Sequence, residues 1–336
     1  MKRIAQIMYM AVFALLLAIP AFAGGGRDVT PAPPPGPGTA LDFVACFNPG
    51  GGHDFLIRNM ELAIRTNNLT PNSVNFLYRP GGNMAVGMTY TRNQRGRSDI
   101  IMAATNQLIA VPIQMDTGVR RQDLTDLAIF GDEFHFFWVM ADSEFMTFDD
   151  LLRANRPITF TSPGAGSFEE ITIEFLQSQH PEADFRIVHT PGSDAESMTL
   201  LLGGHVDVFI NELAGGGMEN YLAAGYLRGL VNLGPRRSYW QPEIPTLMEL
   251  GYDFALSGFR GVMGPPDMSP EAIAWWEDLF YRMFHTPQFQ EYIRVQGLEP
   301  NLILTDRLTE WFDDYTRNLI SIFRSIGIPL VANPYP

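Results

Sequence analysis

Short apolar runs alternate with helix-like amphipathic runs along most of this chain. The apolar runs that indicate strands are Leu41–Cys46, Val74–Tyr78, Asp99–Ala104, Pro157–Thr161, Arg186–His189, His205–Ile210 and Leu227–Leu233. Strands that alternate with helices predict an α/β fold of mostly parallel sheets with helices on both faces. In such sheets ligands bind beyond the carboxyl ends of the strands, so the loops at those ends are where a site is expected.

The loop after the first apolar run, Phe47–Asp54, has the composition of an anion-binding turn. Its three consecutive glycines let the backbone approach a ligand and turn its N–H groups inward. Asp54 can cap the helix that follows. The apolar stripe of that helix consists of Leu56, Met60, Ala63 and Ile64. A tight strand-to-helix turn without a ligand accounts for this single loop equally well, so the later loops decide.

Similar polar turns follow several later strands. They are Arg79–Asn83, Thr105–Gln107, Ser162–Ser167 and Asn211–Glu212, and each offers hydroxyls, amides or N–H groups. Ser167 and Ser193 each have a glutamate three residues later, the spacing of a capping box, so helices are expected to begin there. A capping serine is more often structural than a ligand contact, but the N–H groups beside it can still face an anion.

Residues 1–23 have the three parts of a secretory signal. Two basic residues, an apolar run at Ile7–Ile19 and a small-x-small site ending at Ala23 follow in that order. The run is short for a bilayer and no cysteine follows the cut to carry a lipid, so we expect a periplasmic chain that starts at Gly24. An uncleaved membrane anchor is the alternative. Residues 24–40, mostly Gly, Pro, Thr and Ala, are expected to be a flexible linker.

The chain is acidic, with a formal charge of −14 at neutral pH. Without the signal it has 21 arginines, 37 acidic residues and no lysine, a formal charge of −16. Nucleic acid and anionic membranes are poor partners for this charge. The absence of lysine excludes P-loop, Schiff-base and Ser–Lys chemistry from the mature chain. The one cysteine, Cys46, lies in an apolar strand, which excludes an internal disulfide and predicts a packed thiol.

Five motifs, in the correct order, resemble the Bug-type extracytoplasmic solute receptors of tripartite tricarboxylate transporters. The family's F-x-x-G-G-x-x-D, R-P-G-x-G-G, S-x-G-x-G-[ST], L-L-G-G-x-V-D and V-P-T-x-x-E-x-G segments are similar to Phe47–Asp54, Arg79–Asn83 (shortened), Ser162–Ser167, Leu201–Asp207 and Ile244–Gly251. The resemblance covers most of the mature chain. It implies a two-lobed periplasmic-binding-protein fold, type II-like, whose lobes close on a ligand by a hinge.

The resemblance also implies lobe boundaries, ligands and partners. Residues 41–142 and 257–336 would form lobe 1, and residues 143–256 would form lobe 2. Family ligands are mostly carboxylates, namely citrate and other tricarboxylates, dicarboxylates, acidic amino acids and aromatic acids, so a small tri-, di- or monocarboxylic acid is expected, with no cofactor and no metal. The receptor would be a non-catalytic monomer whose partners are the large and small membrane subunits of the transporter.

Three departures from the family pattern bear on the ligand. Pro191-Gly192-Ser193 replaces a Tyr-Lys-Gly turn that is common in the family, which removes an aromatic and a cationic group. Asn211 stands where many members have Asp. Phe259-Arg260-Gly261 is similar to the W-R-G of a tricarboxylate-like branch and favours a polycarboxylate. Arg260 could pair with a ligand carboxylate or form a structural salt bridge.

The expected site consists of main-chain donors and polar side chains at strand ends. Its residues are Phe47, Gly50, Gly51, Gly52, His53, Asp54, Gly82, Asn83, Thr105, Asn106, Ser162, Gly164, Ala165, Gly166, Ser167, Asn211 and Arg260. Charges beyond about 8 Å are screened at physiological salt, so an acidic chain can still bind an anion. Several hydrogen bonds to a charged group, each about 1.5–3 kcal/mol, can reach micromolar affinity. We expect the turns 50–54 and 164–167 to hold opposite ends of one ligand.

Other conspicuous residues are expected to be structural. The six histidines lack the paired spacing of a zinc site, and His205 and Asp207 are expected on one face of a strand. His53 differs, because it lies inside the proposed turn and is a candidate ligand contact. The aromatic run Phe134–Trp138 predicts a core strand near the lobe crossing, and Trp275-Trp276 should pack a helix that begins after a serine cap and a proline.

Two other functions stay open. A glycine-rich loop followed by serine could hold the nucleophile of an exported hydrolase, although no G-x-S-x-G, H-E-x-x-H or G-x-G-x-x-G motif occurs. Alternatively, the receptor could present its ligand to a sensor kinase.

Overall fold

The computed structural model describes residues 38, 40–162, 167–190, 194–213 and 218–331. The strands in this part of the chain are β1 (Ala40–Ala45), β2 (Ser73–Tyr78), β3 (Ile100–Ala104), β4 (Thr125–Phe134), β5 (Phe136–Met140), β6 (Ile158–Ser162), β7 (Phe185–His189), β8 (Phe209–Asn211), β9 (Leu227–Asn232), β10 (Ser257–Gly264) and β11 (Glu299–Leu304).

The helices of the described residues alternate with these strands. They are α2 (Gly52–Thr66), α3 (Ala85–Arg92), α4 (Gln107–Gln114), the 3₁₀ helix η1 (Arg121–Asp123), α5 (Phe148–Leu152), α6 (Phe168–Gln179), α7 (Asp194–Leu202), α8 (Met218–Ala223), α9 (Pro270–Phe284), α10 (Pro287–Val295) and α11 (Thr305–Ser325). None of them is both long enough and apolar enough to cross a membrane.

The strands form three sheets. The largest has the order β11-β4-β10-β3-β1-β2, and the smaller two are β8-β5-β9 and β6-β7. β1 is parallel to β2 and β3, and β6 to β7, but β10, β4 and β11 pair antiparallel, as do β5, β8 and β9. The expectation of mostly parallel sheets is therefore wrong. Parallel neighbouring strands need a crossover connection, usually a helix. The helices α2 and α3 supply these connections between β1, β2 and β3. β10 instead joins the large sheet after the strands of the two smaller sheets in the chain.

Helices cover both faces of the large sheet, as the sequence predicts. On β1, Phe43 packs with the apolar faces of α2, α9 and α10, while Val44 packs on the other face with α3, α4 and α11. A strand buried on both faces has no polar face, which is why its sequence is a continuous apolar run. Trp275 and Trp276 are buried in α9, whose cap is Ser269, as predicted.

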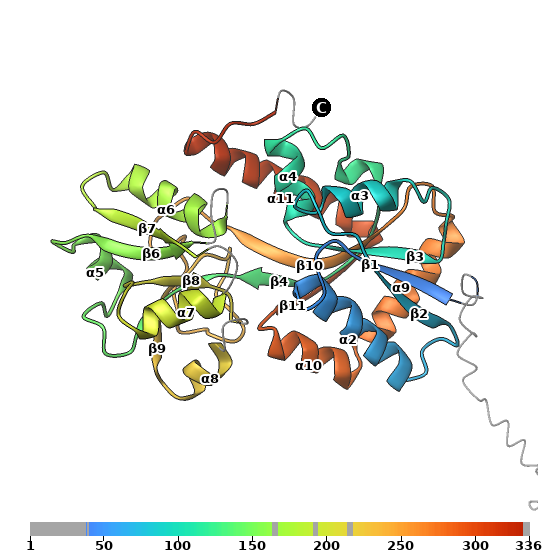
Figure 1. Ribbon diagram of the computed structural model, residues 1–336, viewed down its shortest axis with the longest axis horizontal. Coiled ribbons are helices and arrows are strands. Elements are labelled where there is room, and N and C mark those ends of the chain that lie inside the picture. The colour runs from blue at the N-terminus through green and yellow to red at the C-terminus, as the bar shows by residue number, and fades with distance from the viewer. Residues whose placement is uncertain (1–37, 39, 163–166, 191–193, 214–217, 332–336) are drawn as a thin grey trace, which may run out of the picture. The chain divides into compact units, whose positions relative to one another are not determined.

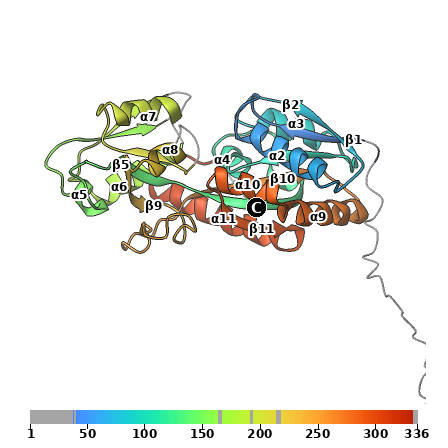
Figure 2. The ribbon, with the colours of Figure 1, turned by 90° about the horizontal axis from the view of Figure 1, so that it is seen from below.

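Two long antiparallel strands, β4 and β10, run from the large sheet toward the smaller sheets (Figure 1). After Phe134 the chain passes through His135 into β5, which belongs to a smaller sheet. All residues of the Phe134–Trp138 run are buried, which confirms the predicted burial, but the run spans the end of β4 and the start of β5 instead of a single strand. Figure 2 shows α11 reaching past the large sheet, where it contacts α6. The lobe boundaries expected from the sequence remain a prediction.

The start of α2 differs from the expectation. Gly51, not Asp54, is its N-cap. The Asp54 carboxylate lies in the first turn of the helix and accepts hydrogen bonds from the Gly50 N–H at 2.8 Å, from Arg58 Nε at 2.7 Å and from the Tyr78 hydroxyl at 2.5 Å. Asp54 therefore stabilises the turn through these hydrogen bonds, instead of facing a ligand.

The residues before β8 also differ. β8 begins at Phe209, so His205 and Asp207 do not lie on a strand as expected. Asp207 accepts hydrogen bonds from Arg156 Nη2 and from the Thr159 N–H, both at 2.8 Å, which ties this turn to β6 and confirms its structural role.

Cys46 is packed, as predicted. Gly87 of α3 lies so close that a Cβ there would be 2.3 Å from the Cys46 Sγ, and burial raises the pKa of the thiol. A protonated, fully buried thiol is chemically inert.

Candidate functional site

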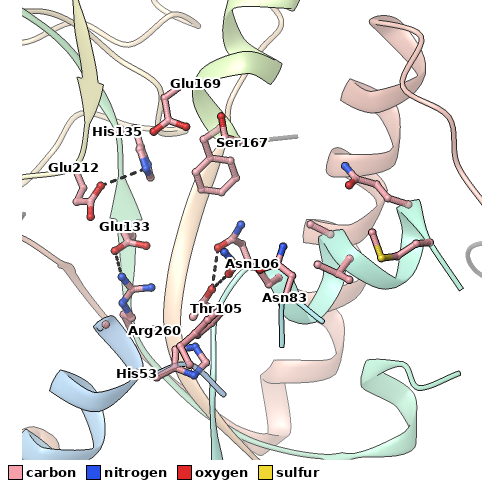
Figure 3. A pocket seen from close by; sticks show the side chains of 18 residues that line it. His53, Asn83, Thr105, Asn106, Glu133, His135, Ser167, Glu169, Glu212 and Arg260 are labelled. Atoms are coloured by element: carbon pink, nitrogen blue, oxygen red, sulfur yellow. Dashed lines mark hydrogen bonds and ion pairs between the residues drawn. The ribbon is translucent and has the colours of Figure 1, made fainter. Parts of the chain in front are cut away.

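One cavity of about 700 Å³ collects most of the loops singled out in the sequence (Figure 3). Its lining comes from the ends of β1 and β3, the loop before α3, the start of α6, the β4–β5 junction, β10 and the loop after β8. The lining residues are Phe47, Gly52, His53, Asn83, Thr105, Asn106, Gln107, Ala110, Val111, Gln114, Met115, Glu133, His135, Ser167, Phe168, Glu169, Glu212 and Arg260. Strand tips thus meet at one cavity, because parallel strands end at the same edge of a sheet.

The cavity brings together eight of the residues expected from the sequence. They are Phe47, Gly52, His53, Asn83, Thr105, Asn106, Ser167 and Arg260. Six others, Gly50, Gly51, Asp54, Gly82, Ser162 and Asn211, do not line it. Gly164, Ala165 and Gly166 lie outside the described residues, as do Pro191-Gly192-Ser193 and the helix start expected at Ser193.

His53 presents a fixed hydrogen-bond donor. Its Nδ1 accepts the Cys46 N–H at 3.2 Å, so the ring proton lies on Nε2. That Nε2 is buried and has no hydrogen-bond partner among the described residues. Burial, together with the nearby charge of Arg260, lowers the pKa of His53 to about 3, so the ring is neutral at physiological pH. His53 can therefore donate to an anion without being a cation.

Arg260 is paired within the cavity wall. Its Nη2 lies 2.5 Å from Glu133 Oε1, and their side chains are only 15% and 8% exposed. Burial lowers the pKa of Arg260, but the charges of Glu133, Tyr292 and Glu212 and the hydrogen bond to Glu133 together raise it above its ordinary value, so the guanidinium stays charged. Arg260 also covers the start of α2, where a Cβ on Gly52 would lie 3.0 Å from its Nη2.

A second cluster lies around His135, at the β4–β5 junction. His135 Nε2 is 3.4 Å from Glu212 Oε2, and its ring packs edge-on against Phe168, with 4.8 Å between centroids. Burial, together with the Arg260 charge, lowers the pKa of His135 to about 3. Glu169 points toward this cluster from the first turn of α6 (Figure 3).

Amide and hydroxyl groups form the other side of the lining. The Thr105 hydroxyl faces the side-chain oxygens of Asn106, at 2.9 Å, and of Gln107. The NH₂ groups of both amides are thereby left as donors in the cavity lining. Ser167 is the N-cap of α6 and accepts the Glu170 N–H at 3.3 Å, which confirms the predicted helix start. A neutral donor set of this kind can hold a carboxylate.

Sequence reasoning missed the acidic part of the lining. Glu133 and His135 were overlooked because they lie in a strand dominated by aromatic residues. The sequence signal that could have indicated them is the presence of a charged residue and a histidine inside an otherwise apolar run, because such groups are rarely buried without a role. Glu169 and Glu212 lie within two residues of the predicted site residues Ser167 and Asn211. The sequence of a helix start or of a loop does not show which of several adjacent side chains faces the cavity.

The two buried histidines predict an acid-sensitive fold. Each has a pKa near 3 in the folded chain and about 6.5 when unfolded, so between these values the unfolded state binds the extra proton. The stability from each histidine is complete above pH 6.5 and declines as the pH falls toward 3, by up to about 1.4 kcal/mol per pH unit. Denaturant unfolding from pH 7 to 4 measures this slope. His135→Gln should reduce it and exposed His285→Gln should not; equal slopes in all three proteins would count against the assignment.

Comparison with known proteins identifies relatives. A sequence model described as "Tripartite tricarboxylate transporter family receptor" matches residues 101–328. The UPF0065 protein in the gbd 5' region of Cupriavidus necator is 27% identical over 195 residues, which span 56% of this chain and 58% of that protein. Protein BugT of Bordetella pertussis is 22% identical over 330 residues, 96% of this chain and 98% of that one.

Solved structures with the same fold include solute-binding proteins. A TctC solute-binding protein from Polaromonas, solved without ligand, has a TM-score of 0.72 at 17% identity, over 85% of this chain and 98% of its own. Rpa4515 of R. palustris, solved with adipate, has a TM-score of 0.69 at 18% identity, over 86% and 97%. The predicted two-lobed periplasmic-binding-protein fold is confirmed.

Proposed function

The chain belongs to the family of tripartite tricarboxylate transporter receptors, and from this premise we propose that it captures a small carboxylic acid in the cavity and delivers it to the membrane subunits of such a transporter. The acid would be released unchanged, so the receptor is not a catalyst. The fold of a solute-binding protein fits this role, because a ligand held between two sheets can be enclosed and released by their relative movement.

The observation that carries the proposal is the convergence of strand ends on one cavity lined by neutral donors. The His53 Nε2–H and the amide NH₂ groups of Asn106 and Gln107 come from two different loops of the large sheet. Each hydrogen bond to a charged group contributes about 1.5–3 kcal/mol. Three such bonds can supply much of the roughly 8 kcal/mol of micromolar affinity.

The size of the cavity suits a small acid. About 700 Å³ is ample for a molecule such as adipate, the ligand in the R. palustris structure. Gly52, with no side chain, leaves room beside Arg260, and Ser167 brings the first turn of α6 to the opposite wall. A helix start adds a favourable electrostatic contribution for an anion of about 0.3–1 kcal/mol.

Location and domain arrangement complete the proposal. Residues 1–23 would be removed as a secretory signal, so that a monomeric chain from Gly24 works in the periplasm. The lobes would be 41–142 with 257–336, and 143–256. The β4 and β10 strands, which leave the large sheet beside the cavity, would carry the hinge.

Calorimetry on the mature chain from Gly24, recovered from the periplasm of its host, tests the function. A panel of mono-, di- and tricarboxylates should contain a ligand with a dissociation constant in the micromolar range or below. His53→Ala should weaken that ligand about 10-fold, because one hydrogen bond to a charged group is lost, whereas exposed His285→Ala should have no effect. Absence of binding to every acid, or equal affinities for the unmodified and His53→Ala proteins, would contradict the proposal.

A further inference from the structure

We propose that the acid held in this cavity also carries an ammonium group and has no net negative charge, so that the ligand is a zwitterion instead of a di- or tricarboxylate. This inference rests on the proposed function, because it names the ligand class of the same cavity. It also departs from the polycarboxylate that Phe259-Arg260-Gly261 favoured in the sequence.

The described lining of the cavity contains more acidic than basic side chains. Among the described residues, three carboxyl groups, Glu133, Glu169 and Glu212, line the cavity together with one guanidinium, that of Arg260. The two histidines of the lining are neutral, because their pKa values are near 3. The lining thus has two more acidic than basic groups. A ligand with two or three carboxylates would add like charges to a partly buried site where screening by solvent is weak.

The cationic side chain of the described lining already has a carboxylate partner. Arg260 lies 2.5 Å from Glu133, and both side chains are largely buried. A ligand carboxylate could use the guanidinium only while also lying near the Glu133 charge. The pair is therefore close to neutral toward a ligand, and Glu169 and Glu212 are the other acidic side chains of the described lining.

The lining also places a donor for a carboxylate and an acidic group on different histidine-containing parts of the cavity. His53 has its proton on Nε2, which is buried and has no partner among the described residues, so it is a donor for a carboxylate. His135 Nε2 lies 3.4 Å from Glu212 Oε2, so an acidic side chain stands beside the second histidine. A ligand with a carboxylate at one end and an ammonium group at the other can use both.

The acidic part of the lining and the part with amide and hydroxyl groups are separated in space. Figure 3 shows Glu169, Glu212 and His135 together on one side of the cavity, and Asn83, Thr105 and Asn106 on another. Phe168 lines the acidic side, where an aromatic ring can contribute to binding an ammonium group. No three acidic, histidine or cysteine side chains of the described residues are grouped so as to hold a metal ion. An organic cation fits this side better than a bound metal does.

Calorimetry with pairs of equal carbon number tests the inference on the unmodified protein. The probes are 4-aminobutyrate against succinate, 5-aminopentanoate against glutarate, and 6-aminohexanoate against adipate. Each pair exchanges a second carboxylate for an aminomethyl group at nearly constant length. In at least one pair the amino acid should bind about 10-fold more tightly or better, the size expected for a hydrogen bond to a charged group.

Two variants then locate the ammonium group. Glu169→Gln and Glu212→Gln should each weaken the preferred amino acid about 10-fold while leaving the dicarboxylate of that pair unchanged or stronger. Glu182→Gln, which replaces an exposed carboxylate outside the cavity, is the control. Thermal unfolding of each variant shows whether it is folded, and the ratios measured on the unmodified protein do not depend on any variant.

Every outcome is decisive. Tighter or equal binding of the dicarboxylate in every pair that binds overturns the zwitterion while leaving the carboxylate receptor intact. Binding of neither class overturns both proposals. Preference for the amino acids with unchanged ratios in Glu169→Gln and Glu212→Gln overturns the assignment of the ammonium group to this side of the cavity.

Discussion

Replacing Gly52 with valine is expected to weaken ligand binding by about 10-fold to 100-fold. A Cβ at this position would lie 3.0 Å from Arg260 Nη2 and 3.3 Å from its Cζ, and the two further methyl groups would occupy the cavity wall. Overpacking of this kind costs about 1–3 kcal/mol. In the free protein Arg260 can shift into the cavity, but a bound ligand prevents that movement, so the cost falls on the complex. Calorimetry with the ligand identified from the acid panel measures the loss.

The neighbouring glycine provides a matched control. Gly51 has extended backbone angles, φ −92° and ψ 177°, which valine adopts readily, and a Cβ there would meet only the Asn48 carbonyl oxygen at 3.5 Å. Gly51 does not line the cavity. Gly51→Val should therefore bind like the unmodified protein. Equal losses for the two variants would show that the turn as a whole, and not the wall at Gly52, controls binding.

Arg260→Met is expected to lower the free energy of unfolding by about 3–5 kcal/mol, because it leaves the Glu133 carboxylate buried without its cation. Glu133 and Arg260 lie on β4 and β10, the strands that leave the large sheet toward the smaller ones. Loss of the pair should therefore also loosen the connection between the sheets. Urea unfolding of the mature chain, followed by circular dichroism, measures the change.

Two further variants separate this charge effect from loss of packing. Adding Glu133→Gln to Arg260→Met should recover most of the stability, since the buried charge is then removed as well. Arg237→Met breaks an exposed pair with Glu249, both side chains 45% exposed, and should cost no more than about 1 kcal/mol. If the double variant were as unstable as Arg260→Met, then lost packing of the aliphatic part of the arginine side chain, and not the unpaired charge, would cause the lower free energy of unfolding.

Much of the site followed from strand order. Because parallel strands end at one edge of a sheet, the sequence alone was enough to place the polar turns after β1, β2 and β3 together. Phe47, His53, Asn83 and Thr105 do line one cavity. The Ser167 cap followed from a three-residue spacing. These are local patterns with a fixed geometric consequence.

What could not be predicted depends on contacts distant in sequence. Which glycine of the Gly50–Gly52 turn faces the cavity is decided by Arg260, some 200 residues later. The antiparallel entry of β10 has no local signal, because pairing direction depends on where the chain returns. The acidic side of the cavity is built by Glu133 on β4, Glu169 on α6 and Glu212 after β8, and no spacing between them reveals that they meet.

A crystal structure of the protein purified from its host, with the small molecule it retains, would show where the ligand binds. We expect an organic acid inside this cavity with a carboxylate oxygen within about 3.2 Å of His53 Nε2, the range of an N–H···O hydrogen bond. A ligand bound elsewhere, or one in the cavity that leaves the His53 Nε2–H without an acceptor, would contradict this expectation.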